Sequence, residues 1–237
     1  MLIAANRDER ADRDWDAPAA WWSDYPGVIG GRDRSAGGTW MALGAHGVLA
    51  AALNRPGSLG PAPGKRSRGE LPLMAALAET AEAATDAITR LDAGAWRPFN
   101  LVIADQRSAF YIEALGQGRP QAMLLAPGLS MVTSHPPNDE SHPRTRRHLP
   151  RFRTVAAPDP AQGDWRAWEK RLADDSHEGD LAVTLKVPLH GGYGTVSASL
   201  LGFGATGERL WRFCPAPPGE GVFKPLELPD DERRLGA

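Results

Sequence analysis

Cysteine is almost absent from the sequence, in which Cys214 is the only example. A single thiol cannot form a disulfide within the chain or build a cysteine-based zinc or iron–sulfur site. Cys214 stands beside prolines, on or just after an apolar segment, with no basic residue next to it. We therefore interpret it as a small buried apolar residue rather than a nucleophile.

The sequence also lacks a charge excess of either sign, since 27 basic and 29 acidic side chains give a net charge of −2. This balance removes the electrostatic argument for a nucleic-acid or anionic-membrane partner. The concentrated basic stretch consists of Arg144, Arg146, Arg147, Arg151 and Arg153, and its prolines and apolar residues favour a solvated helical face. No apolar run approaches the roughly 18 residues of a membrane-spanning helix, and residues 1–15 lack a basic n-region followed by a long apolar run, so we expect no secretory signal. We expect no membrane span and a cytoplasmic location.

Short apolar segments separated by glycine-rich turns predict a chain of hairpin-joined strands. They cover residues 2–5, 28–29, 39–43, 48–53, 99–105, 109–115, 121–126, 129–133, 181–187, 194–203 and 209–214. Helical spacing predicts one broken helix or two over 69–93, and further helices around 144–155 and 164–173. Residues 10–27, rich in Trp and Pro, are expected to form an ordered loop. Segregated helices and hairpin-joined strands indicate an α+β fold, and no repeat or linker divides it, so we expect one domain over 1–237.

The densest polar cluster is Asn6-Arg7-Asp8-Glu9, directly after the apolar residues 2–5. These groups cannot all be buried cheaply unless they satisfy one another. Alternation along a strand predicts Asn6 and Asp8 on one face and Arg7 and Glu9 on the other. The cluster is either an ion pair of Arg7 with Asp8 or Glu9 that closes the strand, or part of a site.

A second motif, GGRDRSAGGTW at 30–40, holds four glycines around Arg32, Asp33 and Thr39. It lacks the GxxxxGK[ST] order of a phosphate loop, and no helix follows it. A nucleotide-binding phosphate loop is therefore not expected. The glycines either supply turns with positive φ or let the backbone approach a ligand closely.

Two further segments have both a structural and a functional interpretation. Asn54 ends a strand of small residues before a Pro-Gly turn, so it is either a turn residue or an amide donor to an oxyanion. The strand YGTVSASL alternates Thr195, Ser197 and Ser199 on one face with apolar residues on the other. That polar face is either solvated or the hydroxyl-lined wall of a pocket.

Taken in order, several motifs resemble the NRDE family, also called the Transport and Golgi organisation protein 2 family. They are AANRDE, GGRD with AGGTW, GVLAAALNRPG, FNLVIAD, PGLSMVTSH and YGTVSAS, and they span nearly the whole chain. The resemblance implies an N-terminal-nucleophile (Ntn) hydrolase-like fold. This is a four-layer αββα sandwich of two largely antiparallel sheets.

The resemblance also implies a site. In related Ntn amidases an N-terminal Cys attacks the amide and its own α-amine acts as the base. By motif position, Arg7 and Asp8 are the candidates that tune this pair, and Asn54 is the candidate oxyanion donor. The candidate ligand-pocket residues are Asn6, Glu9, Arg32, Asp33, Gly38, Thr39, Trp40, His135, Thr195 and Ser197. No metal and no required cofactor are expected.

The sequence departs from the family at its start. The family usually begins with Met-Cys, one hairpin strand before the NRDE motif, whereas here Met1 lies five positions before Asn6. Leu2 has no nucleophilic atom, so we expect the nucleophile-bearing strand to be missing and the chain as given to be inactive as a hydrolase. Either the true start lies upstream or the chain is a non-catalytic version. We favour the first, because the polar cluster is intact.

Three functions compete. The resemblance favours a small-ligand-handling protein that binds and carries haem, with haem as cargo and with His135, His142 and His148 as a histidine cluster. The sequence has no CxxCH motif for covalent haem attachment. The alternative is a Cys-dependent amidohydrolase of linear amides whose Cys lies upstream of Met1. The third hypothesis is an interaction module, against which the clustering of Gly and polar residues argues mildly.

Overall fold

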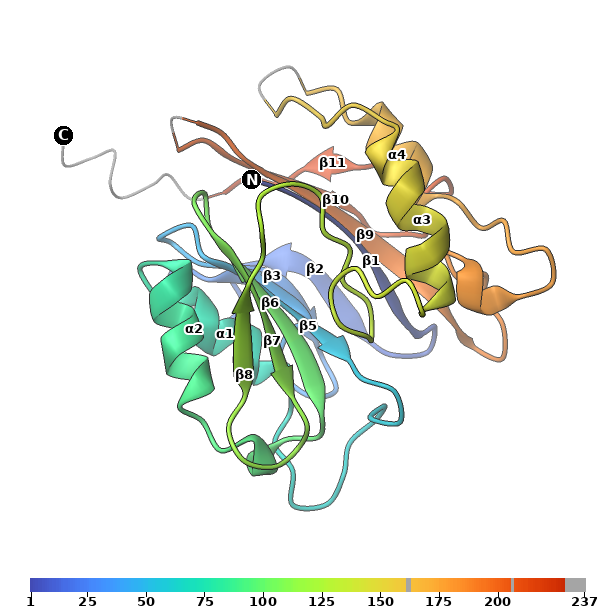
Figure 1. Ribbon diagram of the computed structural model, residues 1–237. Coiled ribbons are helices and arrows are strands. Elements are labelled where there is room, and N and C mark those ends of the chain that lie inside the picture. The colour runs from blue at the N-terminus through green and yellow to red at the C-terminus, as the bar shows by residue number, and fades with distance from the viewer. Residues whose placement is uncertain (161–162, 206, 229–237) are drawn as a thin grey trace. The chain divides into compact units, whose positions relative to one another are not determined.

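The computed structural model describes residues 1–160, 163–205 and 207–228, and its chain divides into two compact units (Figure 1). Within these described residues, unit 1 comprises 1–13, 128–132 and 138–228, and unit 2 comprises 14–127 and 133–137. Unit 1 is built on a four-stranded sheet of order β1-β9-β10-β11 and unit 2 on a seven-stranded sheet of order β2 to β8. All neighbouring strands are antiparallel. The predicted α+β class with two antiparallel sheets is therefore confirmed.

Unit 1 combines the two ends of the described chain. Its elements are β1 (Leu2–Arg10), α3 (Pro143–Arg153), α4 (Arg166–Leu172), the 3-10 turn η2 (Leu181–Val183), β9 (Tyr193–Phe203), β10 (Arg209–Cys214) and β11 (Lys224–Pro225). One face of the sheet packs against the α4 segment, where Trp165, Trp168 and Leu172 meet Ala198 and Leu200 of β9. Central strand β9 is buried along most of its length because β1 and β10 flank it.

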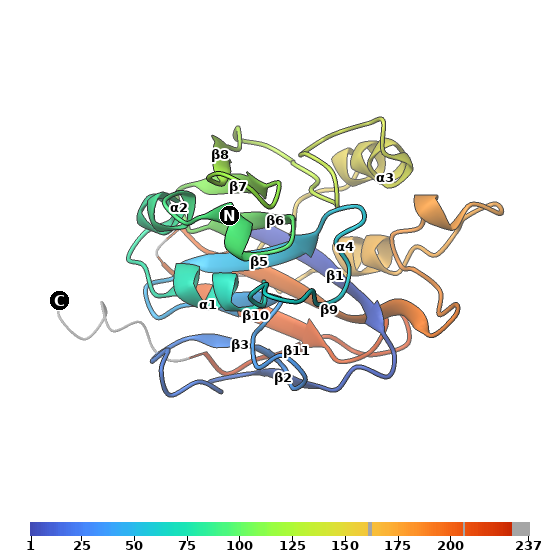
Figure 2. The same cartoon turned by 90° about the horizontal axis from the view of Figure 1, so that it is seen from below.

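Unit 2 holds a meander of hairpins with two helices on one face. Its elements are β2 (Trp15–Ala19), β3 (Ile29–Asp33), β4 (Met41–Leu43), β5 (Leu49–Asn54), α1 (Glu70–Ala76), α2 (Ala81–Thr89), the 3-10 turn η1 (Ala93–Ala95), β6 (Phe99–Ala104), β7 (Ala109–Ala114) and β8 (Gln121–Leu124). Helix α1 contacts β4 and β5, and α2 contacts β6, β7 and β8 (Figure 2). Leu71 and Ile88 join Phe99, Leu101 and Ile103 in the core of this unit.

The predicted interruption between residues 69 and 93 is resolved into two helices. Helix α1 ends at Ala76, and Thr80 then adopts an extended backbone and starts α2. The Thr80 hydroxyl accepts a hydrogen bond from the Ala83 amide at 3.1 Å, which satisfies one of the unpaired amides at a helix start. The boundary is therefore encoded by a capping residue.

Two predicted strands are wrong, and two strands, β2 and the short β11, were not predicted. Residues 129–133 form an irregular loop whose Met131 exchanges backbone and side-chain hydrogen bonds with Asn138. Residues 181–187 start with η2 because the Asp180 carboxylate accepts from the Ala182 amide and turns the chain. Within the expected loop 10–27, the structure has strand β2. Its Pro18 suggested a loop, but an edge strand tolerates proline.

Candidate functional site

The NRDE cluster divides between the two faces of β1, as alternation predicts. The Asn6 amide donates to the backbone carbonyls of Leu172 at 2.9 Å and Leu185 at 3.0 Å, so it points to the face covered by α4. Arg7 pairs with Glu9 at 3.6 Å on the other face. Of the two predicted ion pairs, Arg7 with Glu9 forms, whereas the adjacent Asp8 lies on the face of Asn6.

Both carboxylate oxygens of Asp8 have partners inside unit 1. Oδ1 accepts from the Thr195 hydroxyl at 2.6 Å, and Oδ2 accepts from Nη1 of Arg144 on α3 at 3.2 Å. The Tyr193 hydroxyl donates to the Asp8 carbonyl at 3.2 Å. Burial, together with the charges of Asp8 and Glu9, raises the pKa of Tyr193 to about 12. Asp8 is thus the centre of a polar network that ties α3 to the sheet.

A β-bulge explains why Thr195 meets Asp8. Arg7 pairs with Ser197 but Asp8 pairs with Thr195, which leaves Val196 as an extra residue on β9. The extra residue reverses the alternation, so Thr195 faces Asp8 while Ser197 stays opposite Arg7. The predicted common face of Thr195, Ser197 and Ser199 is therefore wrong for Thr195. Its hydroxyl also accepts from the Val187 amide at 2.8 Å.

The predicted solvated face of the basic stretch is only partly found on α3. Arg146 and Arg153 are exposed. Arg144 binds Asp8, and Arg151 binds Asp174. Nη2 of Arg147 donates to the Ser176 hydroxyl at 2.8 Å. The prediction failed because the helix turns three of its five cations toward acceptors from distant segments, which sequence spacing does not reveal.

The glycine-rich motif of unit 2 packs against tryptophans. The Arg32 guanidinium lies 4.5 Å from the centroid of the Trp21 ring and its Nε donates to Asp16 at 2.8 Å. Trp15 and Trp40 meet edge to face, with centroids 5.8 Å apart. A Cβ on Gly31 would lie 2.1 Å from the Trp40 ring, so this position requires glycine. Close approach is therefore one role of these glycines.

The other candidates in this motif shape the turn that leads to β4. The Asp33 carboxylate accepts from the Ser35 amide at 3.0 Å, and the Thr39 hydroxyl both donates to the Met41 carbonyl and accepts from its amide. Gly38 lies against the backbone of Gly69, where a Cβ would come within 2.5 Å. These residues fix the backbone around the tryptophans.

Asn54 and His135 both belong to unit 2. Asn54 lies opposite Phe99 and follows the alternation of Ala50 and Ala52, so its side chain projects to the face that carries α1 and α2. His135 Nδ1 lies 3.0 Å from the Ser134 hydroxyl. The proposed oxyanion role of Asn54 and pocket role of His135 stay predictions.

Sequence reasoning missed a buried polar cluster on the opposite face of the same sheet. Nη1 of Arg55 donates to Asn100 Oδ1 and to Glu113 Oε1, both at 2.7 Å, and the Tyr111 hydroxyl donates to Asn100 Oδ1 at 2.8 Å. The Asn100 amide donates to the Thr133 carbonyl at 3.2 Å. Burial, with the charge of Glu113, raises the pKa of Tyr111 to about 12. The polar Asn100 inside the apolar strand FNLVIAD is the sequence signal from which this cluster could have been predicted.

Cys214 is buried, and its thiol lies 3.2 Å from the Ala216 carbonyl. Burial raises the pKa of this thiol, which agrees with the predicted role as a buried apolar residue. Among the described residues, no group of three or more His, Cys, Asp or Glu side chains is placed to hold a metal ion. None of the helices in the described ranges is long and apolar enough to cross a membrane.

Comparison with protein families gives one match. The model of the family described as Transport and Golgi organisation 2 matches residues 1–207, which contain every candidate site residue named above. No curated protein matches the sequence.

Proposed function

Since the chain belongs to the Transport and Golgi organisation 2 family, we propose that it binds haem and carries it transiently on the Trp21–Arg32 surface of unit 2. This surface consists of Trp21, Arg32 and Arg34. The sequence resemblance favours haem as the cargo, and the surface offers the two kinds of contact that haem needs.

The observation that carries the proposal is an exposed indole fixed beside arginines. Trp21 is 38% exposed, and its ring nitrogen donates to the Ala17 carbonyl at 2.9 Å, which fixes the ring. An exposed, immobilised indole offers a flat apolar surface on which a porphyrin can stack. Tryptophan side chains, with an apolar body and a polar nitrogen, are enriched at binding interfaces.

Arginines beside the indole supply the charge. Arg32 stacks on Trp21 and shares Asp16 with Arg34, whose Nε lies 4.0 Å from that carboxylate. One carboxylate is therefore shared by two guanidinium groups. Guanidinium groups bind carboxylates such as haem propionates through paired hydrogen bonds. Stacking and propionate pairing without an axial ligand are suited to transient carriage.

The test is a haemin titration followed by the Soret band and by tryptophan fluorescence. Trp21→Ala and Arg32→Gln should each weaken binding about tenfold. The matched control is Arg66→Gln, because Arg66 also stacks on a tryptophan and pairs with a carboxylate, but its partner Trp96 is buried. The proposal is wrong if haemin produces no Soret shift, or if all three variants bind haemin as the unmodified protein does.

The alternative function is a Cys-dependent amidohydrolase, and one observation favours it. In the described part of the chain, β1 pairs with β9 alone, so the outer edge of β1 has no strand partner. A long unpaired strand edge is a template for another strand. A Cys-bearing strand upstream of Met1, pairing with this edge, would bring its nucleophile beside the Arg7–Glu9 pair.

The test of this alternative uses the protein extended by the codons upstream of Met1. Mass spectrometry after incubation with linear amides should detect an acyl adduct on the added Cys, and the Cys→Ala version is the control. An upstream frame without a Met-Cys strand contradicts the alternative, and so does an extended protein that forms no adduct.

A further inference from the structure

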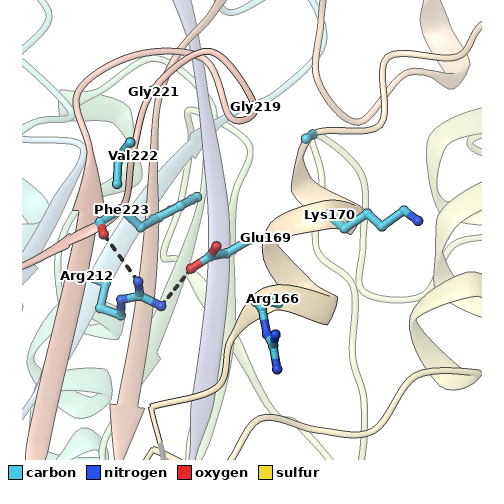
Figure 3. Close-up of a pocket in the computed structure, with 9 residues that line it drawn as sticks. Arg166, Glu169, Lys170, Arg212, Gly219, Gly221, Val222 and Phe223 are labelled. Carbon is cyan, nitrogen blue, oxygen red and sulfur yellow. Dashed lines mark hydrogen bonds and ion pairs between the residues drawn. The ribbon is translucent and has the colours of Figure 1, made fainter.

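Unit 1 contains a pocket of about 370 Å³ between α4, β10 and residues 219–223 (Figure 3). Its lining residues are Arg166, Glu169, Lys170, Ala173, Arg212, Gly219, Gly221, Val222 and Phe223. The volume falls in the lower part of the range for small-molecule sites. None of these residues belongs to the Trp21–Arg32 surface or to the NRDE cluster.

The polar side of the pocket is formed by the ion pair between Arg212 and Glu169. Nη1 of Arg212 binds Glu169 Oε1 at 2.6 Å, and Nη2 donates to the Phe223 carbonyl at 3.2 Å. Figure 3 shows the Arg212 guanidinium joined by dashed lines to both Glu169 and the Phe223 carbonyl. Two anchors hold the guanidinium in one orientation while its side chain stays 22% exposed. A fixed and accessible guanidinium is a ready donor to a second carboxylate.

Two more cations, Arg166 and Lys170, line the pocket. Arg166 pairs with Asp164 at 2.8 Å, whereas Lys170 has no ion-pair partner among the residues that the structure describes. In Figure 3 the Lys170 side chain extends away from Glu169 and Arg212. Its ammonium therefore attracts an anion through the local potential rather than by a direct hydrogen bond.

The apolar part of the lining is held in place by a tight turn. The amides of Glu220 and Gly221 both donate to the Pro217 carbonyl, at 3.0 and 3.1 Å. A Cβ on Gly221 would lie 2.7 Å from the Cys214 sulfur, so the turn sits directly on the buried thiol. This turn presents Val222, which is 69% exposed although it is a branched apolar residue. Covering such a side chain with a ligand's hydrocarbon is favourable.

We propose that this pocket binds a small amphipathic organic anion, with its carboxylate on Arg212 and its hydrocarbon chain over Val222 and Phe223. Glu169 competes with the ligand for the same guanidinium. Affinity is therefore set by how readily the ligand carboxylate shares or displaces that ion pair. The site is independent of haem carriage, because it lies in unit 1 and uses none of the haem-surface residues.

Isothermal titration calorimetry with octanoate tests both parts of the proposed ligand, the carboxylate and the hydrocarbon chain. Octanoate should bind, while acetate, which has the charge without the chain, and octan-1-ol, which has the chain without the charge, should each bind at least about tenfold more weakly. Raising the salt concentration should weaken octanoate binding, because the exposed cations are screened. Absence of octanoate binding, or equal binding of octan-1-ol, overturns the proposal.

Two variants move the affinity in opposite directions. Glu169→Gln removes the competing carboxylate and should tighten octanoate binding about threefold, whereas Val222→Asp should weaken it at least about tenfold. Controls are Glu178→Gln, at a carboxylate outside the lining, and Leu189→Asp, at another exposed apolar residue. Thermal melting of each variant checks that it is folded.

The opposite changes make the result specific to the site, because a general loss of structure would weaken binding in both variants. Weaker binding by folded Glu169→Gln contradicts competition for Arg212. Unchanged binding by Val222→Asp contradicts the apolar wall, and either result overturns the proposal.

Discussion

The Thr195 hydroxyl donates to the Asp8 carboxylate across two neighbouring strands at 2.6 Å. This bond exists because the bulge at Val196 turns Thr195 toward the face of Asp8. Asp8 also binds Arg144 of α3, so its carboxylate lies on the face that α3 covers. Arg7, its neighbour in sequence, pairs with Glu9 on the other face. The two residues proposed to tune one nucleophile reach opposite faces of β1.

Removing the Thr195 hydroxyl should destabilise unit 1. In Thr195→Val the Val187 amide loses its acceptor and Asp8 loses a donor, which we expect to lower the free energy of unfolding by about 1–3 kcal/mol. Urea denaturation measures this change. Thr195→Ser keeps the hydroxyl and is the control. Equal stability of the Val and Ser variants would contradict the network.

Two asparagines of unit 2 give a matched comparison. Asn100 is fully buried and binds Arg55, Tyr111 and Thr133, so Asn100→Ala should cost about 3 kcal/mol because it leaves buried partners unsatisfied. Asn54→Ala at the strand end should cost less than about 1 kcal/mol. Chemical denaturation of both variants checks the difference. A larger loss for Asn54→Ala than for Asn100→Ala would show that the main amide contact was misidentified.

Stability should fall as the pH drops below about 6.5 because of His148. This imidazole is fully buried, and its Nε2 lies 2.8 Å from the Val183 carbonyl. Burial lowers its pKa, an effect that Asp174 opposes and that Arg151 and Arg147 reinforce. Between the lowered pKa and the ordinary value near 6.5, the unfolded chain binds the proton and the folded chain does not. Protonation therefore favours unfolding in this window.

The measurement is the free energy of unfolding between pH 8 and pH 5, with His148→Gln as the comparison. Glutamine can still donate to the Val183 carbonyl but does not titrate. The variant should lack the part of the pH slope just below 6.5. If its slope equals that of the unmodified protein, His148 is not the group responsible.

Glycine at position 31 should be required for the tryptophan packing of unit 2. Gly31→Ala places a methyl group in the Trp40 ring, so we expect a loss of about 3 kcal/mol and a changed near-ultraviolet circular dichroism spectrum. Gly37→Ala is the control, because Gly37 has a φ of +74° but no atom that the methyl group would meet. It should cost about 1 kcal/mol from backbone strain alone and leave the spectrum unchanged. Identical spectra for both variants would contradict this interpretation.

Local patterns in the sequence predicted most of the fold. Strands such as Phe99–Ala104 and Arg209–Cys214 carry their own apolar periodicity and turn signals, so their positions could be predicted. Strand β2 could not, because its Pro18 suggests a loop unless the strand lies at a sheet edge. No sequence pattern indicated that segments of the two units alternate along the chain. The chain leaves unit 1 after Arg13, passes through unit 2 and returns to unit 1 at Gly128. No single linker therefore marks the boundary between the two units.

The candidate site was predictable only where it depends on alternation along one strand. The faces of Asn6, Arg7 and Glu9 follow from their order in sequence. The position of Thr195 depends on a bulge, and the partners of Arg144 and Arg212 come from segments far away in sequence. Bulges and long-range partners are fixed by packing in three dimensions, which a motif does not encode.

The burial of Cys214 beneath Gly221 has a practical consequence. With its thiol covered and its pKa raised, the natural chain is close to inert toward maleimides and other thiol reagents. A cysteine introduced at exposed Leu189 or Met123 would then be the one reactive position in the molecule. Each unit can thus carry a single fluorophore or spin label without first removing a native residue.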